Sequence, residues 1–168
     1  FTVNSYITNR EGKKIDGAKE QTVNLAANAV TTIKQRAAVG GFQLWSLDHP
    51  YLFRAISVIK QNNRVVDSVR QRFGVRDIEI KPNGLFLNAK HVKIFGTNNH
   101  QDHAGVGSAL PDYLQYYRIR LLKNMGVNAY RTSHNAPTPE LLDACDSLGM
   151  LVMDEQRLLN SSPEYMDQ

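Results

Sequence analysis

The sequence predicts a chain of two structural classes: an all-β module over residues 1–87 and the beginning of a parallel α/β module over residues 88–168. Short alternating apolar runs separated by turn residues fill the first part, which is typical of strands. In the second part apolar residues recur at spacings of three and four, which is typical of helices. The charge also changes: 13 basic and 7 acidic side chains give +6 before residue 88, whereas 7 and 9 give −2 after it.

The first module reads as a series of short strands. They are expected over residues 2–7, 23–25, 30–33, 52–59, 65–73 and 75–80, and turn signals follow at residues 9–12, 60–63 and 82–84. Six or seven strands in about 80 residues suit an immunoglobulin-like β-sandwich. Trp45, the only tryptophan, is expected to be buried in the core or between domains, and a ring that stacks on a sugar is the alternative.

The second module alternates strands with helices. A hairpin around residues 88–90 leads to a strand over residues 91–95. A helix follows from Asp112, its expected N-cap, to Gly126, and its apolar stripe is formed by Leu114, Tyr117, Leu121, Leu122 and Met125. Strand 127–131, helix 140–148 and the apolar strand 150–153 complete a strand, helix, strand, helix, strand order. That order is the opening of a parallel α/β sheet.

Polar side chains gather where the three parallel strands end. The turn expected at residues 96–100 lacks the glycine spacing of a dinucleotide-binding loop. In a (β/α)₈ barrel the carboxyl ends of the strands carry the active site, so this clustering predicts a site at that rim. The residues concerned are Asn98, Asn99, His100, His103, Arg131, His134, Asp154 and Glu155.

Residues 126–135 (GVNAYRTSHN) and 145–155 (CDSLGMLVMDE) resemble glycoside hydrolase family 2, closest to its β-galactosidases. Shorter matches lie at residues 44–46, 50–52, 73–76 and 96–107, so the resemblance covers essentially the whole chain. It implies a multi-domain β and α/β protein. Residues 1–87 would be the immunoglobulin-like β-sandwich, and residues 88–168 the first three strands and two helices of a truncated TIM (β/α)₈ barrel.

The resemblance also implies a role for each rim residue in a retaining glycosidase. His100, His134 and Asn99, the last where many relatives have arginine, would bind the substrate. Arg131 would orient the nucleophile by charge and bidentate hydrogen bonds. Asp154 and Glu155 would form an active-site network.

Both catalytic glutamates of this family lie on later strands, so no catalytic residue is expected within the chain. The 168 residues alone are therefore predicted to be inactive. The chain begins without Met, which leads us to expect an excerpt of a longer enzyme.

No cofactor and no metal are expected. Some β-galactosidases bind Mg²⁺ shortly after the third strand, but here Leu159, Asn160 and Ser161 occupy that stretch and supply no ionised ligand. In the hairpin, Ala89 stands where relatives have glycine, which argues against a type I′ turn.

Two other functions remain open from the sequence. The H-x-x-H pattern could place His100, His103 and His134 around a metal in a metal-dependent hydrolase. Alternatively, the sandwich could be a non-catalytic sugar-binding module.

The expected partner is a carbohydrate, β-galactoside-like by the resemblance. Lys and Arg cluster no further than Lys13–Lys14, which argues against nucleic acid, and no apolar run approaches the roughly 18 residues of a membrane span. Strand 150–153 would leave an open barrel edge, so self-association is expected. The only cysteine, Cys145, forms no internal disulfide, and the compartment stays unknown, although the resemblance is compatible with a periplasmic or secreted enzyme.

Overall fold

The structure, a computed structural model, describes residues 1–38 and 40–155 and divides the chain into two compact units. The N-terminal unit comprises Phe1–Trp45 and Tyr51–Arg76, and the C-terminal unit comprises Ser46–Pro50 and the chain from Asp77 onward. The division falls after Arg76, whereas the sequence placed a boundary at residue 87. Residues 78–87 lie in the second unit because their strands pair with each other and with the strand that follows.

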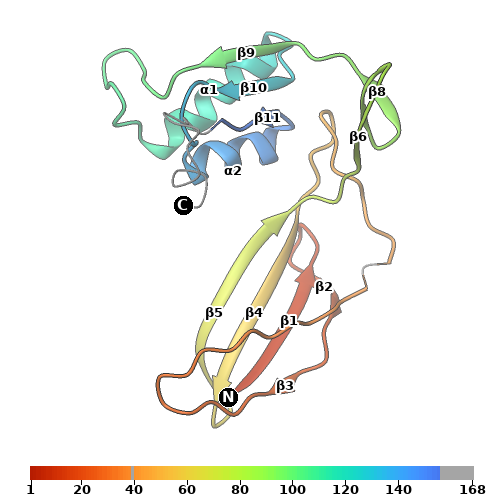
Figure 1. Cartoon of the computed structure of the whole chain (residues 1–168), viewed down its shortest axis with the longest axis vertical. Coiled ribbons are helices and arrows are strands. Elements are labelled where there is room, and N and C mark those ends of the chain that lie inside the picture. Colours follow the sequence, from red (N-terminus) through yellow and green to blue (C-terminus); the bar gives the residue numbers. More distant parts are fainter. Residues whose placement is uncertain (39, 156–168) are drawn as a thin grey trace, which may run out of the picture. The chain divides into compact units, whose positions relative to one another are not determined.

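The N-terminal unit is built on one antiparallel sheet (Figure 1). Its strands are β1 (Thr2–Thr8), β2 (Lys14–Gly17), β3 (Gln21–Thr22), β4 (Phe53–Gln61) and β5 (Arg64–Phe73). The hydrogen-bonded order is β2-β1-β4-β5, and β3 also pairs with β1. The strands expected over residues 2–7, 52–59 and 65–73 are thus confirmed.

A two-residue turn joins β4 to β5. Asn62 and Asn63 have φ angles of 49° and 62°, the left-handed conformation that a type I′ hairpin requires at both positions. Asparagine tolerates this conformation better than most residues, because its short polar side chain can hydrogen-bond locally. The turn therefore sets the register in which Gln61 faces Arg64.

The strands expected over residues 23–25 and 30–33 are wrong. Both segments are irregular, and Val30 is 96% exposed. Alternating apolar and polar residues form a strand only where a neighbouring strand can pair with them. Both edges of β1 are already paired with other strands, so β1 cannot be that neighbour. Among its described residues this unit forms one sheet without a second layer.

Trp45 is fully buried, as a core residue would be. Its ring lies against Gly74, where an added Cβ would come within 3.0 Å of two ring atoms, and the guanidinium of Arg76 lies 4.8 Å from the ring centre. The core position expected for Trp45 is therefore confirmed. A ring buried in this way is not available to stack on a sugar.

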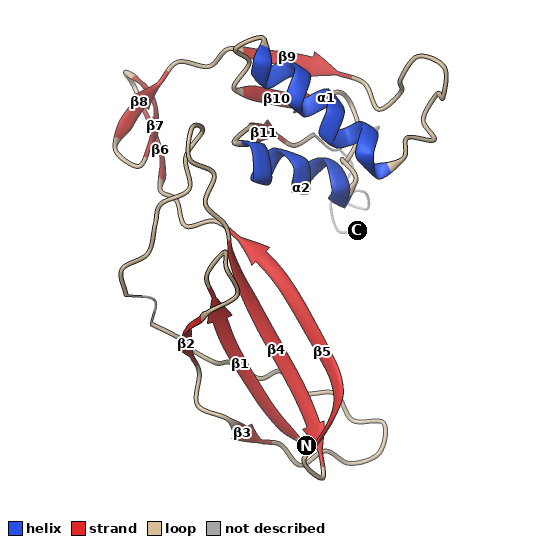
Figure 2. Ribbon diagram, turned by 180° about the vertical axis from the view of Figure 1, so that it is seen from behind, coloured by secondary structure: helices blue, strands red, loops and turns tan. Residues whose placement is uncertain are grey.

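The C-terminal unit begins with a three-stranded meander, β6 (Ile78–Lys81), β7 (Gly84–Leu87) and β8 (Lys90–Val92). It continues with β9 (Gly96–Asn99), α1 (Asp112–Asn124), β10 (Ala129–Thr132), α2 (Pro139–Leu148) and β11 (Leu151–Met153). The last three strands form a parallel sheet in the order β11-β10-β9, and Figure 2 shows both helices on one face of it. The predicted strand and helix order is confirmed.

The first parallel strand lies later than the sequence predicted. Residues 91–95 were expected to form it, but β8 ends at Val92, and the supposed turn at residues 96–99 is β9. The pairing of Gly96 with Ala129 explains the shift, because a Cβ at Gly96 would lie only 3.2 Å from the Ala129 carbonyl oxygen. Close pairing with β10 thus overrides the weak β propensity of the sequence Gly-Thr-Asn-Asn.

The turn between β7 and β8 also corrects the sequence analysis. Asn88 and Ala89 have φ angles of 51° and 63°, so the type I′ geometry is present without a glycine. Alanine bears the steric cost of the left-handed conformation here, because the pairing of Leu87 with Lys90 leaves only two residues for the turn.

The limits of α2 follow its sequence signals. The Thr138 hydroxyl accepts a hydrogen bond from the Leu141 amide, Pro139 occupies the first turn, and Gly149 ends the helix with a φ of 75°. For α1 the N-cap is Pro111, and Asp112 is the first helical residue instead of the expected cap.

The apolar stripe expected on α1 is confirmed only in part, because Leu122 packs against the buried cluster, whereas Met125 is 76% exposed. Tyr117 and Leu121 are each 42% exposed, whereas Gln115 and Ile119 are buried. Spacings of three and four fit two adjacent stripes of one helix, and packing selects the stripe around Ile119. The buried cluster of the unit contains Ile119, Tyr130, Leu141, Ala144, Cys145 and Met150. Among the described residues, neither helix is long and apolar enough to cross a membrane.

Candidate active site

Strand alternation divides the side chains of the parallel sheet between two faces. On β10, Tyr130 and Thr132 are buried on the face that packs on the helices, and Arg131 therefore points to the opposite face. Burial raises the pKa of the Tyr130 phenol above its ordinary value, with the Arg118 guanidinium opposing that rise. Arg131 pairs in register with Asn98 on one side and Met153 on the other, so these side chains share its face.

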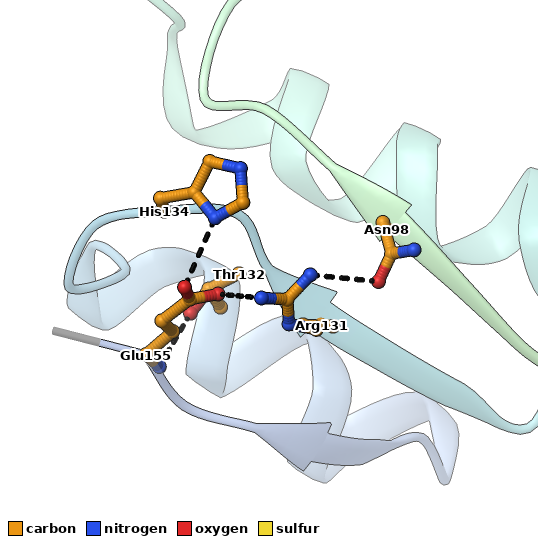
Figure 3. Close-up of polar contacts among 5 residues, drawn as sticks. All are labelled: Asn98, Arg131, Thr132, His134 and Glu155. Atoms are coloured by element: carbon orange, nitrogen blue, oxygen red, sulfur yellow. Dashed lines mark hydrogen bonds and ion pairs between the residues drawn. The ribbon is translucent and has the colours of Figure 1, made fainter. Parts of the chain in front are cut away.

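Glu155 is the centre of a polar cluster at the carboxyl ends of β10 and β11, drawn in Figure 3. Its Oε2 lies 2.8 Å from Nη2 of Arg131, and its Oε1 lies 2.9 Å from Nδ1 of His134. The Glu155 amide donates a hydrogen bond to the Thr132 hydroxyl, with a distance of 2.9 Å. Arg131 also reaches Asn98 Oδ1 at 3.4 Å. We call Asn98, Arg131, Thr132, His134 and Glu155 the Glu155 cluster.

The ion pair in the Glu155 cluster contributes little stability, and its main effect is to orient the side chains. Arg131 and Glu155 compensate each other, and their side chains are 36% and 26% exposed, so solvent screens the pair to a worth of at most about 1 kcal/mol. Each oxygen of the carboxylate nevertheless has a specific partner. The pairing therefore fixes where the guanidinium and the imidazole point.

The contact with Glu155 also assigns the hydrogen on His134. An ionised carboxylate can only accept a hydrogen bond, so Nδ1 of His134 carries the hydrogen that it donates at 2.9 Å. When this ring is neutral, its Nε2 is an acceptor. A hydroxyl group is a donor of the kind that this nitrogen can bind.

The structure brings together most of the residues that the sequence selected. His100 lies beside His134, with ring centroids 5.5 Å apart and planes at 80°. Arg131 and Glu155 belong to the same cluster. Asn99 is directed elsewhere: its amide donates to the Thr97 hydroxyl at 2.7 Å, and it lines a cavity with Gln115 and Tyr130 of the helix-facing layer.

Asp154 is exposed and lies outside the Glu155 cluster. From the sequence, Asn98 was expected at the rim without a role, and Thr132 was not expected there. The identity of the asparagine that faces Arg131 depends on the register of β9 against β10, which pairs Arg131 with Asn98. No local signal in the sequence sets that register.

The metal-dependent alternative requires His100, His103 and His134 to converge. Within residues 1–38 and 40–155, no group of three His, Cys, Asp or Glu side chains is placed to hold a metal ion. His103 instead directs Nδ1 toward the carbonyl oxygen of Ala104 at 2.9 Å, within its own turn. The expectation about Leu159, Asn160 and Ser161 lies outside the described residues.

A parallel sheet with helices on one face and a polar cluster at its carboxyl ends is the arrangement found in part of a (β/α)₈ barrel. Comparisons with known proteins agree. Residues 78–164 match the model of the glycosyl hydrolases family 2 TIM barrel domain, and residues 1–76 match a second model described as glycosyl hydrolases family 2. The chain belongs to glycoside hydrolase family 2.

Individual relatives support the same assignment. The chain is 34% identical over 155 residues to the β-galactosidase BoGH2A of Bacteroides ovatus. This alignment covers 92% of the chain and 18% of that enzyme. A solved family 2 member from Bacteroides cellulosilyticus superposes with a TM-score of 0.85 at 38% identity, over 92% of the chain and 21% of that structure. The β-glucuronidase of Parabacteroides merdae superposes with a TM-score of 0.83 at 28% identity, over 99% of the chain and 21% of that structure.

The matches define the architecture at a coarse level. They support a β-sandwich domain, of which the described residues of this chain form one sheet, followed by part of a TIM barrel. The chain spans about a fifth of the length of these relatives.

Proposed function

We propose that the whole protein is a retaining glycoside hydrolase, β-galactosidase-like, that cleaves terminal β-glycosidic bonds, and that this chain supplies part of its sugar-binding site. The Glu155 cluster at the ends of β10 and β11 supports the proposal. It presents a guanidinium and an imidazole of fixed orientation on one rim. The glycosidases related to the chain support the class of reaction.

His100 and His134 bind hydroxyl groups of the sugar in this proposal. His134 accepts a hydroxyl hydrogen at Nε2, because Glu155 holds the hydrogen of the ring on Nδ1. Asn99, which the resemblance also counted as substrate-binding, supports the rim from the helix-facing side through Thr97.

Arg131 orients the nucleophile. Its guanidinium has five N–H donors, and the contacts with Glu155 and Asn98 leave others available for a second carboxylate. A carboxylate held in this way stays ionised and keeps a fixed direction toward the anomeric carbon.

Glu155 is an orienting residue and not the nucleophile. Both of its oxygens are engaged, by Arg131 and by His134. Retaining hydrolysis needs two carboxyl groups about 5–5.5 Å apart, one as nucleophile and one as acid and base. We place that pair on strands that follow β11 in the whole protein, so the 168 residues alone do not hydrolyse glycosides.

Steady-state kinetics of the whole protein test these roles. With a nitrophenyl β-galactoside, Arg131→Ala should lower kcat more than it raises KM, because its partner is the nucleophile. His134→Ala should impair both constants, because its partner is the sugar. Arg120→Ala on α1 is the control, since this exposed arginine lies outside the cluster. Wild-type constants in both rim variants would overturn the proposal.

A further inference from the structure

The ring of His100 depends on its backbone for its position. Among the described residues, the contact of this imidazole is the edge-to-face packing on His134 at 5.5 Å. His134, in contrast, is anchored through its own side chain by Glu155. Whatever fixes the main chain at residue 100 therefore sets the distance between the two rings.

Arg118 of α1 is the side chain that holds this main chain. Its Nη2 donates to the carbonyl oxygen of His100 at 2.8 Å, and its Nη1 lies 3.5 Å from the carbonyl oxygen of Gln101. Arg118 follows Gln115 and precedes Ile119, both buried, so the guanidinium extends from an anchored part of the helix. The planar fork of arginine reaches two consecutive carbonyls, which a single ammonium does less well.

Gln101 ties the His100 loop to the His134 loop. Its Nε2 donates to the carbonyl oxygen of Ala136 at 3.0 Å. On the other side of the two histidines, the Ser133 amide donates to the Asn99 carbonyl oxygen at 3.1 Å. The loops after β9 and β10 are thus joined on both sides of the imidazole pair.

We propose that Arg118 and Gln101 are positioning residues that hold His100 against His134 and so set the spacing of the sugar-binding imidazoles. The inference rests on the proposed function of the two histidines. Arg118 acts on His100 through a carbonyl oxygen and touches no reacting atom. His134 is held by Glu155, which Arg118 and Gln101 do not contact, so the two supports are separable.

Removing the guanidinium should leave a folded protein. Arg118 and Gln101 line a cavity of about 130 Å³, together with Gln115. Gln115 is 7% exposed, and its Oε1 has no hydrogen-bond partner among the described residues. A water molecule in the cavity can satisfy this oxygen. In Arg118→Met, water can reach the freed carbonyls, while the spacing of the rings loses its restraint.

Kinetics of the whole protein give the first readout. Arg118→Met should raise KM for a nitrophenyl β-galactoside about tenfold, as expected for loss of one sugar hydrogen bond, with kcat changed less than about threefold. Arg118→Lys should recover part of the loss, and Gln101→Leu should raise KM in the same direction. Arg120→Met is the matched control, because it removes an exposed arginine from the same helix.

A double mutant separates positioning from general damage. In a His100→Ala background, Arg118→Met should have little further effect on KM, whereas in a His134→Ala background it should still raise KM. Equal effects in both backgrounds, or an unchanged KM in Arg118→Met, would overturn the proposal.

Imidazole NMR resonances of the 168-residue chain test the geometry without any activity. Arg118→Met should shift the His100 resonances, and Arg120→Met should not. Unchanged His100 resonances in Arg118→Met would overturn the positioning role. An inactive wild-type whole protein with shifted resonances would instead refute the proposed function alone.

Discussion

Replacing Gly149 by alanine should destabilise the C-terminal unit much more than replacing Gly126 by alanine. Both glycines follow a helix in the left-handed conformation, with φ angles of 75° and 86°. Their surroundings differ. A Cβ at Gly149 would overlap the carbonyl oxygen of Leu47, whereas a Cβ at Gly126 would meet nothing within 4 Å.

The expected magnitudes follow from these contacts. Alanine in the left-handed conformation costs about 1–2 kcal/mol, and both variants bear this cost. At Gly149 the obstacle is backbone, so the segment at Leu47 must move. That segment accepts a hydrogen bond from Lys123 Nζ at 3.0 Å, and Lys123 also donates to the Gly149 carbonyl oxygen at 2.9 Å. Loss of one such bond adds about 2 kcal/mol, for a total near 3–4 kcal/mol.

Urea unfolding of the 168-residue chain, followed by far-ultraviolet circular dichroism, measures the difference. The signal reports this unit, because α1 and α2 both belong to it. We expect Gly149→Ala to lose about 2 kcal/mol more than Gly126→Ala. Equal losses would refute the reasoning, since they would show that Leu47 does not pack on Gly149.

Three further predictions concern the same chain. Ala89→Gly should stabilise it by about 0.5–1 kcal/mol in thermal unfolding, because glycine relieves the positive φ at that turn, and a loss of stability would contradict this. Burial, and to a lesser extent Asp146, raises the pKa of Cys145 from its ordinary value of 9.0 to about 12. Thiol reagents should therefore label Cys145 only after unfolding. Rapid labelling without denaturant would contradict this assignment. The free energy of unfolding should be unaffected by this thiol below pH 9.0 and should decline from there toward pH 12, because the thiol ionises first in the unfolded chain. The chain should also self-associate in sedimentation through the apolar face around Ile80 and Met153, which line a groove of about 440 Å³ and are 86% and 63% exposed. Ile80→Glu with Met153→Glu should reduce association and Val30→Glu should not, whereas equal effects would exclude this surface.

The sequence predicted elements whose signals are local. The hairpin of β4 and β5 follows from alternation and the Asn62–Asn63 turn, and α2 follows from Pro139 and Gly149 at its ends. The strand at Gly96–Asn99 was missed because its stability comes from pairing with β10, far along the chain. Residues 30–33 show the converse, since their alternation finds no neighbouring strand.

The candidate site was likewise predicted where its signals are local and missed where it depends on long-range pairing. Arg131 lies near the end of a strand that the sequence identified, and His134 and Glu155 follow such strands; parallel strands bring their carboxyl ends to one edge. The sequence predicted Asn99 as the asparagine of the site, whereas Asn98 faces Arg131 in the structure. Only the β9–β10 register decides between them, because a shift of one residue turns a side chain to the other face. The hydrogen bond from Glu155 to Thr132 likewise depends on tertiary contact.

The central claim is that this chain carries sugar-binding residues of a glycosidase whose catalytic carboxyl pair lies elsewhere in the whole protein. Hydrolysis of a nitrophenyl β-galactoside by the whole protein and by the 168-residue chain, each with and without Glu155→Gln, tests it most directly. We expect turnover by the whole protein, weaker turnover when Glu155 is replaced, and none by the 168 residues. Turnover by the 168 residues that disappears in Glu155→Gln would contradict the account, because Glu155 would then be a catalytic carboxylate.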